Sequence, residues 1–273
     1  MEKINLYEKR SFGENFNLTF DFLKQNYGAI CKPLCYLIPF FLIVAYFQRH
    51  EISGSFDYDS SPYSLESFLG TLLSYIGAFI VNIYVACYMV EYVESGNIKV
   101  ESSKVWARVK SSAAPLIVSG ILYTLAVAAG FMLCLVPGII IAVYWVFYTY
   151  AYVAHEPGIT DCLTSSYYLV KESWWVTFGY LLLFGIGVMI IQLLFMMPLY
   201  LYFVGEMLQI PFLTSEIYQY VSASISNLGT LFVSPVMSIG LGVMYYSLRT
   251  EVYGIDVDAT IDNLGLGEQD DEQ

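Results

Sequence analysis

Charged residues are scarce in this chain, and their scarcity limits its class more than any motif does. Only 13% of the residues are Asp, Glu, Lys or Arg, whereas hydrophobic residues make up 57%. A soluble domain carries roughly 25% charged residues, so this chain has too little charge to cover a water-facing surface. The composition therefore argues against an ordinary soluble domain and favours a membrane protein.

Histidine and the motifs of catalysis are also nearly absent. His50 and His155 are the only histidines, which argues against a histidine-rich metal site. The sequence contains no HExxH, no GxSxG and no glycine-rich phosphate loop. We therefore expect no enzymatic activity, no cofactor, no metal ion and no nucleic-acid partner.

Cysteine is sparse and irregularly placed. Its five positions are odd in number and scattered, and two of them, Cys31 and Cys35, lie one helical turn apart. That spacing suits a disulfide poorly, and free cysteine behaves as a small hydrophobic residue in a core. The pattern predicts free thiols.

Long apolar runs dominate the centre of the chain. Residues 115–136 and 139–154 are separated only by Pro137-Gly138, and no charged residue occurs between Lys110 and Glu156. About 20 apolar residues at ~1.5 Å rise cross ~30 Å of hydrocarbon. Proline cannot continue a helix and glycine relaxes the backbone, so we predict a transmembrane hairpin that reverses at Pro137-Gly138.

The same interpretation extends to the whole chain. It predicts an all-α, polytopic integral membrane protein with one membrane domain over residues 1–253 and an acidic, disordered cytoplasmic tail over residues 254–273. Residues 48–66 are expected to form a polar loop, whereas residues 199–223 are ambiguous. The six predicted spans cover about 28–47, 67–90, 115–136, 139–154, 174–197 and 224–248.

An amphipathic segment precedes every second span. In residues 11–27 the apolar side chains follow one helical stripe, and Ser11 and Glu14 have capping-box spacing. An ordinary amphipathic core helix is the alternative. Because a span follows immediately, we favour a helix in the cytoplasmic membrane interface. Residues 91–113 and the segment after Thr160 predict two more such helices.

The three interfacial segments end alike. Lys24, Lys110 and Lys171 stand at similar positions before spans one, three and five. This indicates a hairpin repeated three times about an axis along the membrane normal. The alternative is that any inserted hairpin tends to begin with a basic residue.

The basic residues also predict orientation. Eleven of the twelve Lys and Arg residues fall on one side of the predicted topology, with Arg49 alone on the other. Since basic residues concentrate in cytoplasmic loops, we expect both termini in the cytoplasm.

Polar groups inside the spans are few. Asn82 and Gln192 are the strongest, and we expect each to hydrogen-bond a neighbouring helix rather than a substrate. The lack of ionisable residues at this depth argues against a proton-coupled transporter or an ion pump.

Two segments resemble a bacterial superfamily. They read LVPGIIIAVYWVFYTYAYVAHEPGITDCLTSSYYLVKESWW and YYSLRTEVYGIDVD. They are similar to the membrane domain attached to some glycerophosphodiester phosphodiesterases, which has many stand-alone, uncharacterised members. Ser247 departs from that pattern, where an acid is common. The resemblance implies a six-helix domain in a bacterial cytoplasmic (inner) membrane. It carries over no catalytic residue, because these segments contain no phosphodiesterase domain. The matching positions are Leu163, Ser166, Leu169, Val170, Lys171, Tyr245, Tyr246, Leu248, Arg249, Gly254 and Asp256.

Two functional classes stay open at this point. The first is a non-catalytic membrane or envelope protein that binds membrane lipids or a membrane protein partner. The alternative is a carrier or channel for a small or lipidic solute. A wide cavity among spans two, four and six favours the carrier, and tight packing there favours the first class.

The positions of the bases suggest a binding site. Lys24, Lys110, Lys171 and Arg249 all stand where a span meets the cytoplasmic interface, which predicts a site for an anionic lipid headgroup. The alternative is that these charges only set topology. The aromatic residues expected to fix the depth of the interfacial helices are Tyr27, Trp106 and Trp174.

Overall fold

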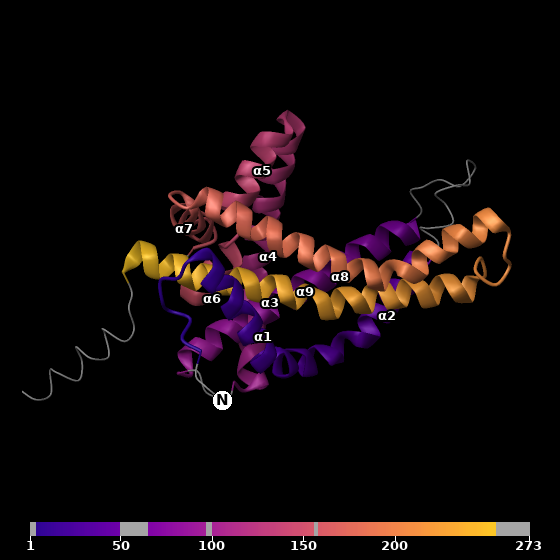
Figure 1. Ribbon diagram of the computed structural model, residues 1–273, viewed down its shortest axis with the longest axis horizontal. Helices are drawn as coiled ribbons and strands as arrows, with labels where there is room; N and C mark the ends of the chain where they lie inside the picture. Colours follow the sequence, from indigo (N-terminus) through magenta and orange to yellow (C-terminus); the bar gives the residue numbers. More distant parts are fainter. Residues whose placement is uncertain (1–3, 50–64, 97–99, 156–157, 255–273) are drawn as a thin grey trace, which may run out of the picture. The chain divides into compact units, whose positions relative to one another are not determined.

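The fold was analysed in a computed structural model that describes residues 4–49, 65–96, 100–155 and 158–254. Every regular element in these ranges is helical, which confirms the all-α class (Figure 1). Almost all of the predicted tail and polar loop lie outside them. The elements are α1 (Phe12–Leu34), η1 (Cys35–Leu37), α2 (Ile38–Gln48), α3 (Leu65–Glu94), α4 (Ser102–Leu133), α5 (Leu135–Tyr144), α6 (Tyr148–His155), α7 (Asp161–Val170), α8 (Trp174–Leu208) and α9 (Glu216–Tyr253).

Within the described ranges, six helical segments are long and apolar enough to cross a membrane. A lipid bilayer offers no hydrogen-bond partners to a peptide backbone, so a span must satisfy its own backbone groups, as a helix does. The chain is therefore a multi-pass membrane protein. The segments are Phe12–Gln48, Leu65–Glu94, Ser102–Leu133, Leu135–His155, Trp174–Leu208 and Glu216–Tyr253.

The first segment begins at the predicted cap. The backbone N–H of Ser11 donates to the Glu14 carboxylate at 2.7 Å, which confirms the capping box and starts α1 at Phe12. Helix α1 then continues past Gly28, where we expected an interfacial helix to end and the span to begin. The interruption is the short 3₁₀ turn η1 instead. Pro39 follows in the first turn of α2, where a missing N–H costs nothing.

The central hairpin reverses at a different residue from the predicted one. Helix α4 ends at Leu133, Cys134 is extended, and α5 begins at Leu135. Pro137-Gly138 thus lies in the first turn of α5, where proline is tolerated, so the predicted reversal was wrong by three residues. The two arms lie side by side (Figure 1).

Two glycines permit this close approach. A Cβ atom added to Gly130 would lie 2.8 Å from the Cα atom of Gly138, and one added to Gly138 would lie 2.5 Å from the Phe131 ring. Real Cβ contacts are longer than this, so α4 and α5 touch through their backbones. Small residues serve this purpose widely between membrane helices.

The second and third predicted interfacial helices differ from each other. Helix α4 runs from Ser102 through Pro115 without a break, so no separate helix precedes the third span. Helix α7, by contrast, ends at Val170 and is separate from α8. The threefold repeat therefore stays a prediction.

The segment left ambiguous by the sequence is now assigned. Helix α8 continues through Pro198 to Leu208, beyond the predicted end of the fifth span. Gln209 then adopts a positive φ of 55°, and the N–H of Ile210 donates to the carbonyl of Gly205 at 2.8 Å, which closes the helix end. Helix α9 begins at Glu216.

Contacts divide the chain into two compact units. Unit 1 contains Met1–Gln25, Ala86–Leu182 and Ile239–Gln273, and unit 2 contains Asn26–Val85 and Leu183–Ser238. Helices α1, α3, α8 and α9 each supply residues to both units.

In unit 1, helices from predicted spans two, four and six meet at Gly242. A Cβ atom there would lie 2.3 Å from the Met89 sulfur and 2.8 Å from the Tyr150 ring. Tyr150 is fully buried and stacks on Tyr245, with 5.6 Å between ring centroids. The contact among these three spans is closely packed.

In unit 2, polar side chains join neighbouring helices. Asn82 on α3 donates to the Ser238 hydroxyl on α9 at 3.1 Å. Gln192 on α8 donates to the Ser226 carbonyl and the Thr230 hydroxyl of α9, each at 3.3 Å. Both sequence-based expectations for these side chains are confirmed.

An apolar stripe on α4 faces outward. Ile117, Ile121 and Leu125 recur every four residues and are exposed, whereas Val109 and Leu116 are buried. Large contiguous apolar surface is unusual on a soluble monomer but suits contact with lipid tails. All five cysteines are free thiols, as predicted.

We expect Gly130→Ala to destabilise the protein, because the new methyl group would meet the backbone of Gly138, which cannot move aside as a side chain can. Overpacking of this kind costs roughly 1–3 kcal/mol. The measurement is the midpoint of thermal unfolding in mild detergent, with circular dichroism as the signal.

Gly185→Ala is the matched control, since no atom lies within 4 Å of a Cβ placed at Gly185 in α8. Its midpoint should stay the same or rise, because alanine favours a helix by up to about 1 kcal/mol over glycine. Equal midpoints for the two variants would contradict the close contact at Gly130.

Candidate functional site

A polar site forms in unit 1 where the chain enters α1. Residues 4–10, which we call the N-terminal strap, lie outside any helix and run beside the last turns of α9. Ile4 and Leu6 are buried, and the Tyr7 ring meets the Tyr246 ring edge-on at 4.9 Å. Apolar burial thus holds the strap against the helix.

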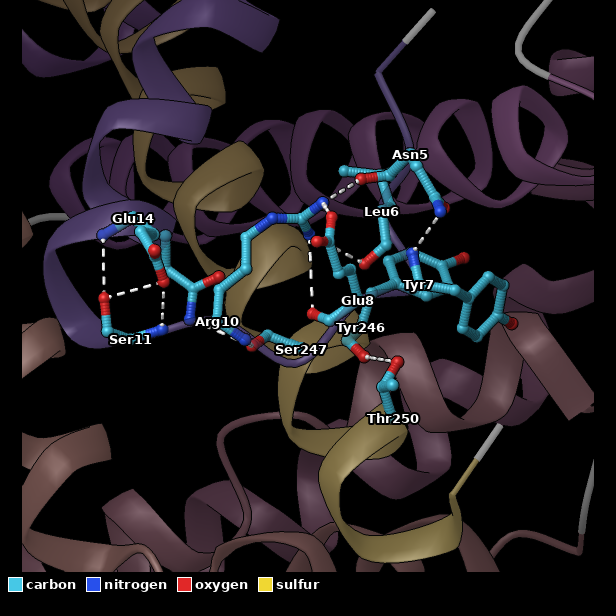
Figure 2. Close-up of polar contacts among 11 residues, drawn as sticks. Asn5, Leu6, Tyr7, Glu8, Arg10, Ser11, Glu14, Tyr246, Ser247 and Thr250 are labelled. Carbon is cyan, nitrogen blue, oxygen red and sulfur yellow. Dashed lines mark hydrogen bonds and ion pairs between the residues drawn. The ribbon is translucent and has the colours of Figure 1, made fainter. Parts of the chain in front are cut away.

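The Arg10 side chain binds the strap residues that precede it in the chain (Figure 2). Its guanidinium donates to the carbonyl of Asn5 at 2.7 Å and to those of Leu6 and Glu8 at 3.4 Å each, and it pairs with the Glu8 carboxylate. A planar group with five N–H donors suits this task, because it can bind several carbonyls at once. The sequence analysis did not single out Arg10.

Ser247 connects the strap, α1 and α9. Its hydroxyl oxygen accepts a bond from the backbone N–H of Arg10 at 3.3 Å and one from the Asn15 side-chain amide at 3.0 Å. The only sequence signal here was that Ser247 departs from the resembled pattern. Its two partners, the Arg10 N–H and the Asn15 amide, are distant in the chain and could not be predicted from residue spacing.

Arg249 lies one turn nearer the end of α9 than Tyr245 and faces the strap. It donates to the Tyr7 hydroxyl at 3.1 Å. Burial raises the pKa of Tyr7 above its ordinary value, and the nearby guanidinium opposes that shift. Tyr7 therefore keeps its proton at neutral pH and accepts the Arg249 bond as a neutral phenol.

Two clefts border the strap. The first, of about 540 Å³, is lined by Lys9, Ser11, Asn15, Ser173, Met244 and Glu251 among others, and we call it the Asn15 cleft. The second, of about 570 Å³, is lined by Asn5, Glu8, Arg10, Asp21 and Lys24 among others, and we call it the Lys24 cleft. Charges of both signs line each one.

The four predicted headgroup residues have different surroundings. Lys24 is 76% exposed and pairs with Asp21 at 3.2 Å, so its charge is partly compensated. Lys110 on α4 and Lys171 after α7 are exposed, and within the described ranges neither forms an ion pair. Arg249 is half-buried against Tyr7. Of the four, only Lys24 lines either of these two clefts.

The predicted aromatic anchors are all half-buried. Tyr27, in unit 2, donates to the Phe232 carbonyl at 2.6 Å. Trp174 stacks on Phe178 at 5.2 Å between ring centroids, and its indole nitrogen is buried without a hydrogen bond. Its neighbour Trp175 is exposed instead.

The described residues hold no group of three or more His, Cys, Asp or Glu side chains that could bind a metal ion. Arg108 on α4 binds the Glu94 and Glu91 carboxylates of α3, at 3.4 Å for Glu91, and these acids serve an ion pair. The two clefts at the strap, by contrast, are lined by charged and polar side chains that can bind polar or charged groups.

These observations define a multi-pass helical membrane protein with a polar site at one helix junction. Residues 66–248 match the family described as Domain of unknown function (DUF7847). The match covers more than half of the chain, and the protein belongs to this family.

No curated protein and no solved structure matches the chain. The family is uncharacterised, and nothing in these comparisons ties it to the membrane domain of glycerophosphodiester phosphodiesterases. That resemblance stays a prediction.

We expect Arg10→Ala to release the strap, because the carbonyls of Asn5, Leu6 and Glu8 all lose the guanidinium as a donor. Hydrogen exchange of the strap amides, followed by mass spectrometry, should become roughly tenfold faster or more.

Lys9→Ala is the control for the loss of a cation. Lys9 pairs with Glu251 at 2.9 Å, but both side chains are substantially exposed. Such surface pairs contribute about 0–1 kcal/mol, so exchange should change little. If the strap amides exchanged at the same rate in both variants, the Arg10 side chain would not be what holds the strap in place.

Proposed function

We propose that this chain is a non-catalytic multi-pass protein of the bacterial cytoplasmic membrane that binds membrane lipids. Its role would be in maintaining the membrane or envelope, alone or with a membrane protein partner. The proposal rests on three features. They are the six described helices that are long and apolar enough to span a membrane, the exposed apolar stripe of α4, and the exposed lysines at the helix junctions.

The packing at Gly242 is the observation that favours a lipid-binding protein over a solute carrier or channel. A carrier or channel needs a path for its solute among the spans, and spans two, four and six were the expected place for it. Gly242, Met89 and Tyr150 from those spans instead lie in van der Waals contact, with no room for even one added methyl group. This supports a packed bundle whose contacts with lipid are on its outside.

Lys110 and Lys171 are the residues best placed for an anionic headgroup. Each is exposed, and within the described ranges neither has an acidic partner. A basic group near an anionic membrane surface contributes about 1 kcal/mol. Lys24 contributes less in this proposal, because Asp21 offsets its charge.

The proposed orientation places both termini in the cytoplasm. A fluorescent protein fused after Tyr253 should fluoresce in bacterial cells, whereas alkaline phosphatase at the same position should be inactive, since it needs the oxidising periplasm. Active phosphatase together with a dark fluorescent fusion would overturn the orientation and move the junction lysines to the wrong side.

The lipid proposal predicts unequal effects of three single charge removals. Lys110→Gln and Lys171→Gln should each reduce retention of an anionic glycerol-headgroup phospholipid by about threefold to fivefold in native mass spectrometry. Lys24→Gln removes the same charge but should have a smaller effect, because Lys24 is already paired.

The triple variant of Lys24, Lys110 and Lys171 to Gln completes the series. If it retained anionic lipid at the wild-type level, these lysines would only set topology. If a defined small solute co-purified in place of lipid, the carrier alternative would gain support.

A further inference from the structure

Asn15, which lines the Asn15 cleft, has a buried acceptor without a hydrogen-bond partner. Asn15 is only 2% exposed, and its amide nitrogen donates to Ser247. Its side-chain carbonyl oxygen is buried and accepts no hydrogen bond. A buried polar atom without a partner costs free energy, so native proteins almost always supply one, whether from protein, water or ligand.

Other polar groups line the same cleft. The hydroxyl residues Ser11 and Ser173 stand at the starts of α1 and α8. The first N–H groups of a helix have no partners within the helix, and the helix dipole makes this end positive. At α1 the Glu14 carboxylate and the Ser11 hydroxyl already cap this end, so the start of α8 is the relevant one. Lys9 adds a cationic side chain to the same lining, whereas the guanidinium of Arg10, which also lines the cleft, is bound to Glu8 and to the strap carbonyls. This part of the cleft suits a phosphate group.

Helix α9 supplies a negative charge to the cleft. Glu251, in its last turn, lines the cleft and pairs with Lys9 at 2.9 Å, with both side chains open to solvent. The carbonyl oxygen of Asn15 adds a second acceptor. Together they suit a group that donates several hydrogen bonds and carries positive charge, such as a primary ammonium.

The remaining wall is apolar. Phe12, Val176 and Met244 line the same cleft, and a volume of about 540 Å³ exceeds what a single water or ion would fill. An apolar wall beside polar groups of both signs matches an amphipathic molecule.

We propose that the Asn15 cleft binds the headgroup of a zwitterionic phospholipid that carries a primary ammonium. The ammonium donates to the Asn15 carbonyl oxygen and to Glu251, and the phosphate lies against Lys9 and the start of α8. This inference rests on the proposed lipid-binding function and adds a headgroup preference to it. The junction lysines Lys110 and Lys171 do not line this cleft.

The test compares three phospholipids with identical acyl chains. Their headgroups are 2-aminoethyl phosphate, choline phosphate and glycerol phosphate. The purified full chain in mild detergent is offered all three at equal concentration and analysed by native mass spectrometry. Choline has no N–H donor for Asn15, so the aminoethyl lipid should be retained about fivefold over the choline lipid, the effect of one good hydrogen bond.

Two substitutions at Asn15 locate that preference. Asn15→Leu keeps the approximate size but removes the buried acceptor, and the retention ratio should fall towards one, because only the exposed Glu251 is left to accept from the ammonium. Asn15→Asp keeps acceptor oxygens and should preserve the preference. Because Asn15 also holds Ser247, thermal unfolding midpoints of both variants establish that they are folded.

A second variant tests the cleft without touching Asn15. Val176→Trp places a large ring on the apolar wall and should also abolish the preference. Val118→Trp on α4 is its matched control, since Val118 is exposed to a similar extent, 44% against 46%, and lines neither cleft at the strap.

The outcomes separate the two proposals. Retention of no phospholipid of any headgroup would reject the lipid-binding function itself. Retention without preference for the aminoethyl headgroup, or a preference that survives both Asn15→Leu and Val176→Trp, would reject only the site proposed here.

Discussion

Polar groups inside a bilayer have no water to bind, and this constraint shapes the whole molecule. The backbone meets it by forming helices, whose hydrogen bonds are internal to each segment. Side chains meet it by pairing across helices, as Asn82 does with Ser238 and Gln192 does with Thr230. The carbonyl oxygen of buried Asn15 departs from this rule, as do the Trp174 indole nitrogen and the Thr177 hydroxyl at the start of α8.

Close packing meets a second need that the bilayer creates. Lipid tails are as apolar as leucine, so burial of apolar surface alone does not hold membrane helices together. Glycines allow the backbones to approach until van der Waals contact and side-chain fit provide the stability. Gly130 and Gly138 do this for the α4–α5 hairpin, and Gly242 does it where α3, α6 and α9 meet. The same contacts leave no path for a solute at that point.

The charged residues show how far local spacing carries an argument. The Lys24–Asp21 pair is three residues apart on one helix face, so its partner could have been read from the sequence. The partners of Arg249 and Ser247 could not, since Tyr7 and Asn15 are more than 200 residues away along the chain. Four cations that look equivalent by position relative to the spans therefore differ in how free their charge is.

The sequence alone determined the all-α class, the number of spans, the free thiols, the cap of α1 and the interhelical roles of Asn82 and Gln192, because each depends on local composition or periodicity. It misplaced the hairpin reversal by three residues, since proline is compatible with a first helical turn as well as with a break. Only the tertiary structure decided the strap, the Asn15 cleft and the packing at Gly242. Each of these joins segments distant in the chain, and no short-range pattern records which distant side chains will meet.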